Sequence, residues 1–195
     1  FWHTLFTDLK FRVVLSPRSS KKIYEKGIES IPSESVCYPA KLSHGHIESL
    51  IEKGIKYIFY PSVAYERKEN VTQGNHYNCP VVTSYPEVIR NNVDNLEINE
   101  IIFRNPFIDL SRKTMFTNLK DEFKSFGISD KELKAAIEHA YEELQQCRLD
   151  IQGEGEKVLA YLKENNIWHE ITEHKAVYNM AELAEVDTPY PEADA

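Results

Sequence analysis

Cysteine is scarce in this sequence, which excludes a fold held together by disulfides. The chain has 195 residues and three cysteines, an odd number that provides no disulfide framework. No charged-then-apolar signal segment is present either. We therefore expect reduced thiols and a cytoplasmic protein.

Basic segments and long apolar runs are also missing. The formal net charge is −8 and there is no basic arm, so a nucleic-acid partner is not expected, because phosphate binding depends on Lys and Arg. No apolar run approaches the roughly 20 residues that span a bilayer, so a membrane partner is not expected. The hydrophobic content of 42% and charged content of 28% are typical of a globular protein.

Common catalytic motifs are absent as well. The sequence has no P-loop and no glycine-rich dinucleotide motif after a strand. It also has no H-E-x-x-H and no G-x-S-x-G. Nucleotide binding in particular has no support from a local motif.

What the sequence does contain is an alternation of strand and helix patterns over its first half. Strands are predicted at 11–15, 55–60, 80–84 and 98–103, where apolar, β-branched or aromatic residues cluster. Helices are predicted at 2–9, at 21–26, at about 39–53 and for about two turns from Pro86. This order predicts an α/β fold with a mainly parallel, Rossmann-like sheet flanked by helices on both faces.

Only helix patterns follow residue 111. One helix is closed by Gly127, and a capping box at 129–132 starts a longer helix. That helix carries one apolar stripe over about five turns, made of Leu133, Ile137, Ala140, Leu144, Cys147 and Ile151. Cys147 is therefore interpreted as a small core residue, and the glycines at 153–155 as a helix interruption.

Three parts are predicted along the chain. They are an α/β domain at 1–110, a helical extension packed on it at 111–167, and a tail at 168–195. The chain opens on Phe1 with no initiator Met, inside an apolar pattern typical of a helix already under way. We expect a fragment of a longer polypeptide or a processed chain.

Cys37 lies just before a predicted helix start, which is a favourable place for a chemically active thiol. Pro39 fits the first position of the predicted helix and Gly54 fits its end. The positive end of a helix favours a thiolate over a thiol. The position suits a metal ligand, a cluster ligand or a reactive cysteine, and the alternative is a buried structural cysteine.

Soft or borderline metal ligands gather between positions 37 and 79. They are Cys37, His44, His46, His76 and Cys79. A zinc site is one interpretation, although His44 and His46 are two residues apart and point to different sides of the predicted helix. A cysteine nucleophile with His76 as its base is another.

Four motifs in this region resemble a known family. They are S-V-C-Y-P-A-K at 35–41, I-F-Y-P at 58–61, N-H-Y-N-C-P at 75–80 and S-Y-P-E-V-I at 84–89. With them the sequence resembles the acyl-CoA dehydratase activase-related proteins, which are associated with the 2-hydroxyglutaryl-CoA dehydratase and benzoyl-CoA reductase systems of anaerobes. The resemblance covers residues 1 to about 167.

The resemblance implies the N-terminal domain of a 2-hydroxyacyl-CoA dehydratase activase-related iron–sulfur redox protein. In it, Cys37 and Cys79 would be ligands of a [4Fe–4S] cluster used in ATP-dependent electron transfer. Ser62 stands where a further cluster cysteine often follows, so the ligand set of this chain is incomplete. The remainder of the full-length polypeptide, or a dehydratase or activator subunit, would supply the rest.

Sequence geometry makes it difficult for Cys79 to share one cluster with position 62. If 80–84 is a strand parallel to 55–60, Cys79 lies at the opposite end of the sheet from Ser62, roughly 17–20 Å away. Tyr38, Lys41 and His44 would be candidates for residues surrounding the cluster at Cys37, and the alternative is that they lie on a solvated helix face. The alternative function is a non-catalytic α/β scaffold that docks on a partner through the helices of 111–165.

The longer relatives carry an ATPase activator module that is missing here, so we expect no activity from this chain alone.

Overall fold

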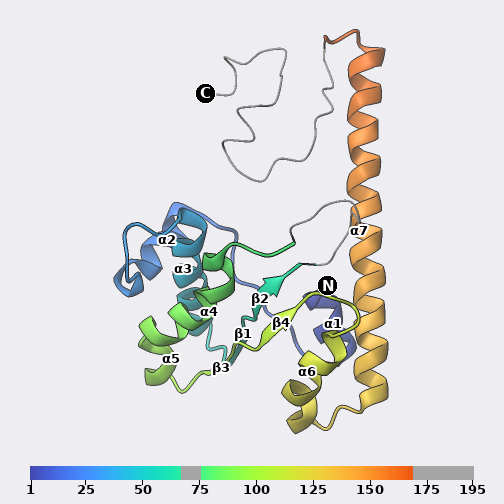
Figure 1. The fold of residues 1–195 in the computed structure, drawn as a ribbon. Helices are drawn as coiled ribbons and strands as arrows, with labels where there is room; N and C mark the ends of the chain where they lie inside the picture. Colours follow the sequence, from blue (N-terminus) through green and yellow to red (C-terminus); the bar gives the residue numbers. More distant parts are fainter. Residues whose placement is uncertain (67–75, 169–195) are drawn as a thin grey trace. The chain divides into compact units, whose positions relative to one another are not determined.

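The computed structural model describes residues 1–66 and 76–168 (Figure 1). Its helices are α1 Trp2–Asp8, α2 Lys21–Gly27, η1 Ile28–Ser30, α3 Tyr38–Glu52, α4 Pro80–Asn92, α5 Asn95–Ile98, α6 Met115–Phe123, η2 Lys124–Phe126 and α7 Asp130–Glu164. Its strands are β1 Tyr57–Phe59, β2 Ser62–Tyr65, β3 Ile102–Arg104 and β4 Phe107–Asp109. The chain divides into two compact units, Phe1–Leu144 and Gln145–Ala195. All four strands belong to the first unit.

The strands pair in parallel, as the sequence predicts. β1 pairs with β3, and β2 pairs with β4. Two backbone hydrogen bonds of 2.9 Å continue the pairing from one pair to the next, from Tyr60 N–H to the Arg104 carbonyl and from Ser62 N–H to the Pro106 carbonyl. Pro61 and Pro106 fall at the break between the pairs, because proline has no N–H to donate to the ladder.

Two hydrophobic cores lie on opposite faces of these strands. Successive side chains of a strand point to opposite faces, and accordingly Ile58 and Phe59 belong to different cores. The first core combines Ile58 with α3, α4 and α5, through Ala40, Ile47, Tyr85, Ile89, Val93 and Leu96. The second receives Phe59 and Ile108 against α1, α6 and the first turns of α7, through Leu5, Met115, Leu119, Phe123, Leu133, Ala136, Ile137, Ala140 and Tyr141. Helices therefore cover both faces of the strands, which confirms the predicted α/β class (Figure 1).

The predicted helix ends are confirmed where local signals specify them. Gly54 follows α3 with φ +76°, and Gly127 follows η2 with φ +72°, the left-handed conformation that glycine adopts without strain. The capping box is formed before α7, where Glu132 N–H donates to Ser129 Oγ at 3.3 Å and Ser129 N–H donates to the Glu132 carboxylate at 2.9 Å.

The strand predicted at 80–84 is wrong, because these residues form the first turns of α4. Pro80 occupies the first turn, where its missing N–H costs nothing, and Cys79 is the N-cap. Tyr85 and Ile89, four residues apart, are both buried in the first core. This helical spacing outweighs the strand propensity of the β-branched residues at 81–83. The predicted helix start at Pro86 therefore lies inside the helix.

Two other strand predictions also need correction. Residues 11–15 form no strand, and Phe11 instead packs its ring against Phe6, Phe123 and Phe126. The stretch predicted at 98–103 divides between the end of α5 and the strand β3. Both runs are short, and packing rather than propensity decides their structure.

The helix α7 continues through residues 153–155, so the predicted interruption is wrong. Cys147 is exposed, which corrects its interpretation as a core residue. The stripe is buried only as far as Ala140, because the second core ends at Tyr141. Within the described residues no helix is both long and apolar enough to cross a membrane.

α2 and α3 approach each other backbone to backbone. A Cβ added at Gly27 would lie 2.3 Å from the Gly45 nitrogen, and one added at Gly45 would lie 1.7 Å from the Ile23 carbonyl oxygen. Real side chains do not fit at such distances. The two glycines therefore allow a helix contact that any other residue would prevent.

Candidate functional site

Cys37 and Cys79 occupy equivalent positions at the starts of two helices. Cys37 is the N-cap of α3 and Cys79 is the N-cap of α4, and each helix has a proline in its first turn. Both thiols are exposed, and neither forms a capping hydrogen bond with its helix. The first amides of a helix have no partners within it and favour negative charge nearby. Each cysteine thus lies where an anion is favoured.

The two helices lie side by side and run in the same direction. His44 Nε2 of α3 lies 3.0 Å from the Tyr85 hydroxyl of α4. Further along, Asn95 donates a 2.9 Å hydrogen bond from the start of α5 to Glu48 of α3. The two contacts advance along both segments in the same order, so the helices are parallel (Figure 1). The starts of α3 and α4 therefore lie at the same end of the pair.

The contact between His44 and Tyr85 also determines where the two cysteines lie along the axes of α3 and α4. Cys37 precedes His44 by seven residues, and Cys79 precedes Tyr85 by six. At about 1.5 Å per residue the two N-caps lie at nearly the same level along the helix axes. Because packed helix axes are roughly 8–10 Å apart, the two cysteines border one region beyond the helix ends.

The start of α4 is attached to β2. Asn78 N–H donates to the Ala64 carbonyl at 3.0 Å, and the Thr83 hydroxyl donates to the Val63 carbonyl at 3.3 Å. Ser62 precedes both contacts and is buried at the first position of β2. The sequence-based separation of Cys79 from Ser62 assumed a strand at 80–84, and that assumption does not hold. In open α/β sheets, the region beyond the carboxyl ends of parallel strands is where ligands bind.

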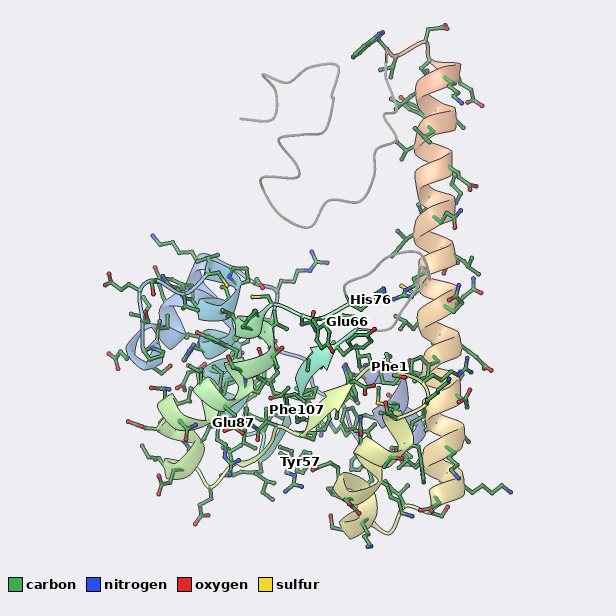
Figure 2. The ribbon with its side chains drawn as sticks, in the orientation of Figure 1. Phe1, Tyr57, Glu66, His76, Glu87 and Phe107 are labelled. Carbon is green, nitrogen blue, oxygen red and sulfur yellow. The ribbon has the colours of Figure 1, made fainter. Side chains whose placement is uncertain are left out.

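The five metal-ligand candidates between 37 and 79 do not come together as one group of three or more in the described part of the chain. Figure 2 shows Glu66 and His76 beside the end of β2, where Glu66 N–H donates to the His76 carbonyl at 2.8 Å. His46 Nε2 lies 2.9 Å from Ser19 Oγ, away from the partners of His44. Across residues 1–66 and 76–168, no three His, Cys, Asp or Glu side chains form a group that could hold a metal ion.

His44 is fully buried and hydrogen-bonded at both ring nitrogens. Ser30 Oγ donates its one hydrogen to the Gly27 carbonyl at 3.0 Å, and lies 2.8 Å from His44 Nδ1. Nδ1 must therefore be the donor to Ser30, which leaves Nε2 to accept from the Tyr85 hydroxyl. In this neutral tautomer, the two hydrogen bonds of the His44 ring connect η1, α3 and α4.

Electrostatics agree with this assignment and connect the network to Cys37. Burial lowers the pKa of His44 to about 4, so the ring is neutral near pH 7. Burial also raises the pKa of Tyr85, and the negative charges of ionised Tyr60 and Cys37 raise it further. Cys37 therefore lies within electrostatic reach of the Tyr85 hydroxyl, at the shared end of α3 and α4.

A comparison with protein families assigns the chain to a family. Residues 1–181 match the family model described as "CoA enzyme activase uncharacterised domain (DUF2229)". The chain belongs to this family. The match confirms the resemblance drawn from the four motifs, three of which surround the helix starts and the end of β1. Neither a search of curated proteins nor one of solved structures found a match.

The three residues expected near Cys37 differ in their surroundings in this activase-related domain. Lys41 Nζ donates to the Glu34 carbonyl at 2.6 Å. Tyr38 is exposed and its ring packs against Tyr24. Only His44 is fully buried, so it is a structural link rather than a residue of a solvated helix face.

Sequence reasoning missed Tyr85, the partner of His44. It lies in the motif at 84–89, immediately after the segment that was assigned to a strand. A helical assignment from Pro80 would have placed Tyr85 four residues before Ile89 on one apolar face. That spacing was the available signal, and the strand propensity of Val81 and Val82 concealed it.

Proposed function

We propose that this activase-related domain is an iron–sulfur redox component of an acyl-CoA dehydratase or reductase system. In this proposal, Cys37 and Cys79 supply two thiolates to a [4Fe–4S] cluster that serves ATP-dependent electron transfer. The remaining ligands come from the remainder of a full-length polypeptide, or from a dehydratase or activator subunit.

The observation that supports the proposal is the placement of two exposed cysteines as N-caps of parallel, adjacent helices. One such cysteine is common in proteins, but two at the same level of one helix pair can bind a common group. The donor set also fits iron–sulfur chemistry in part, because thiolates are the ligands that such clusters take. A [4Fe–4S] cluster requires four ligands, and no third candidate ligand joins the two cysteines within the described residues, so in this proposal they supply two of the four.

The surrounding residues suit a negatively charged group. The first-turn amides of α3 and α4 have no partners within their helices, and such amides hydrogen-bond to anions and to cluster sulfurs. The neutral tautomer of His44 and its bond to Tyr85 hold the two helices in register without adding charge. A bound cluster would pass single electrons, and its potential would depend on these hydrogen bonds and on burial.

Thiol proximity is the first test. A monofunctional trivalent arsenical, phenylarsine oxide, binds tightly only where two thiols are close together. We expect one equivalent to bind per chain, with binding lost in Cys37→Ala and in Cys79→Ala. Cys147→Ala is the matched control, since Cys147 is also exposed but lies within α7. Binding that survives both single substitutions would contradict the shared site.

Cluster binding is the second test. Anaerobic reconstitution with iron and sulfide of the chain together with a dehydratase or activator subunit, followed by metal analysis and absorption spectroscopy, should give a brown complex that depends on Cys37 and Cys79 and not on Cys147. Circular dichroism should show that the substituted proteins stay folded. A colourless complex would leave the docking scaffold as the function.

A further inference from the structure

The starts of α3 and α4 together present backbone amides that have no acceptor within their helices. The first three amides of a helix lack such an acceptor, and neither start has a side-chain cap or an acidic residue in its first turn. Proline has no N–H, so the amides concerned are those of Tyr38, Ala40, Val81 and Val82. Two adjacent helix starts therefore direct N–H donors and positive partial charge toward one region.

Ser62 adds a buried hydroxyl that also has no partner. Its exposed fraction is 4%, and its Oγ forms no hydrogen bond within the described residues. Among the described side chains, the polar atom that is both sealed from solvent and unpaired is Nδ1 of His46. Ser62 Oγ therefore keeps some contact with solvent. A buried polar group without a partner is costly, and such groups commonly bind a water or a ligand.

The neighbours of Ser62 along the chain show which way its side chain points. Ile58 and Tyr60 contribute to the first core, whereas Val63 contributes to the second. Side chains alternate between the two faces along a strand. Ser62 therefore points to the same face as Ile58 and Tyr60, which is the face covered by α3 and α4.

Ser62 also lies near the level of the helix starts. The Tyr60 hydroxyl is 3.3 Å from Ser43 Oγ of α3, and Ser62 lies two residues further along, about 6–7 Å away. α4 runs opposite to β2, since it first meets Ala64 and then Val63. The same distance corresponds to about four residues of a helix. Ser62 is therefore level with the first turn of α3.

We propose that the cluster-free chain binds a phosphate-type oxyanion at the shared start of α3 and α4. The first-turn amides and the Ser62 hydroxyl supply several converging donors, which suit the acceptor oxygens of a phosphate group. Lys41, at the end of the first turn of α3, adds a positive charge that its hydrogen bond to the neutral Glu34 carbonyl does not cancel. The chain as a whole has a net charge of −8, so binding depends on this local arrangement. An oxyanion and a cluster would compete for the same amides.

The site is tested on the full, cluster-free chain with inorganic phosphate. In a ¹⁵N nuclear magnetic resonance titration at fixed pH and ionic strength, with chloride as the reference anion, phosphate should shift a defined set of amide signals and saturate them at one phosphate per chain. The set is Tyr38, Ala40, Val81 and Val82. Shifts that do not saturate, or that occur elsewhere on the chain and not at these amides, would overturn the proposal.

Two serine substitutions test the contribution of the hydroxyl. Ser62→Ala should weaken phosphate binding about tenfold, because a hydrogen bond to a charged group is lost. Ser49→Ala is the matched control, since Ser49 is equally buried but its hydroxyl donates to the His46 carbonyl within α3. It should bind phosphate as wild type does, and circular dichroism should show that both variants stay folded. Equal affinity in wild type and Ser62→Ala would contradict the proposed site.

Phenyl phosphate distinguishes two sources of the phosphate group. Binding at the same amides with an affinity at least equal to that of inorganic phosphate would identify the ligand as the phosphate group of an organic molecule. Weaker binding would identify it as the free ion. The titrations use no iron, so a failed cluster reconstitution would leave them unchanged, and the two proposals are tested separately.

Discussion

Replacing His44 with a residue that does not titrate should remove much of the acid sensitivity of the fold. Burial lowers the pKa of His44 from an ordinary value of 6.5 to about 4. Between these two values the unfolded chain binds a proton that the folded chain does not, so folding stability falls as the pH falls. The contribution of neutral His44 is fully present above pH 6.5 and is lost progressively toward pH 4.

The magnitude follows from the same two values. Each pKa unit corresponds to about 1.4 kcal/mol. Integrated over pH, the fall in pKa gives a loss of about 2 kcal/mol between pH 7 and pH 5, and about 3 kcal/mol by pH 4. The structural reason is that a protonated ring must donate from both nitrogens, whereas Nε2 accepts from the Tyr85 hydroxyl in a fully buried position.

Urea unfolding of wild type, His44→Gln and His3→Gln, followed by circular dichroism at pH 7, 6 and 5, measures this loss. Glutamine at position 44 keeps an acceptor for Tyr85 and does not titrate, so His44→Gln should lose about 2 kcal/mol less than wild type over this range. His3 is exposed, so His3→Gln should follow wild type. The raised pKa of His139, held by Asp8, acts in the opposite direction but is common to all three proteins. Equal pH dependence in wild type and His44→Gln would refute the reasoning.

Three further substitutions test packing and capping, each by urea unfolding at pH 7. Gly45→Ala places a methyl group against a backbone carbonyl of α2 and should cost about 3 kcal/mol or prevent folding. Gly153→Ala has open space around its Cβ and should instead stabilise α7 by about 0.5–1 kcal/mol, so equal effects of the two glycine substitutions would contradict the backbone contact. Ser129→Ala removes the acceptor at the start of α7 and should cost about 1 kcal/mol, whereas no loss would mean that the capping box is not formed in solution. Leu119→Ala empties a fully buried position and should cost about 2–5 kcal/mol, and a loss typical of a surface substitution would contradict the second core.

Local signals in the sequence were sufficient for the helix starts and ends and for the α/β class. Pro39, Gly54, Gly127 and the capping box act within one or two turns, so no distant partner is needed to interpret them. The segment at 80–84 shows the opposite case. Its β-branched residues favour a strand by propensity, but the buried face shared by Tyr85 and Ile89 makes it helical.

The candidate site was predicted only in part for the same reason. The position of Cys37 at a helix start is local, and the sequence predicts it correctly. The parallel placement of α4 beside α3 depends on the contact between His44 and Tyr85, which are 41 residues apart. Burial of α7 is also a long-range property, because the stripe continues through Cys147 although the core that covers it ends at Tyr141.

The glycine contact between α2 and α3 has a consequence for motion. Two backbones in direct contact have no side chains that can repack between them, so α3 cannot roll or slide against α2 without a steep steric cost. α4, by contrast, meets α3 through side chains such as Tyr85 and Ile89, which can adjust. α2 and α3 are therefore expected to move as one body, and a change in the separation of Cys37 and Cys79 would come from movement of this body and α4 relative to each other, not from sliding of α3 along α2.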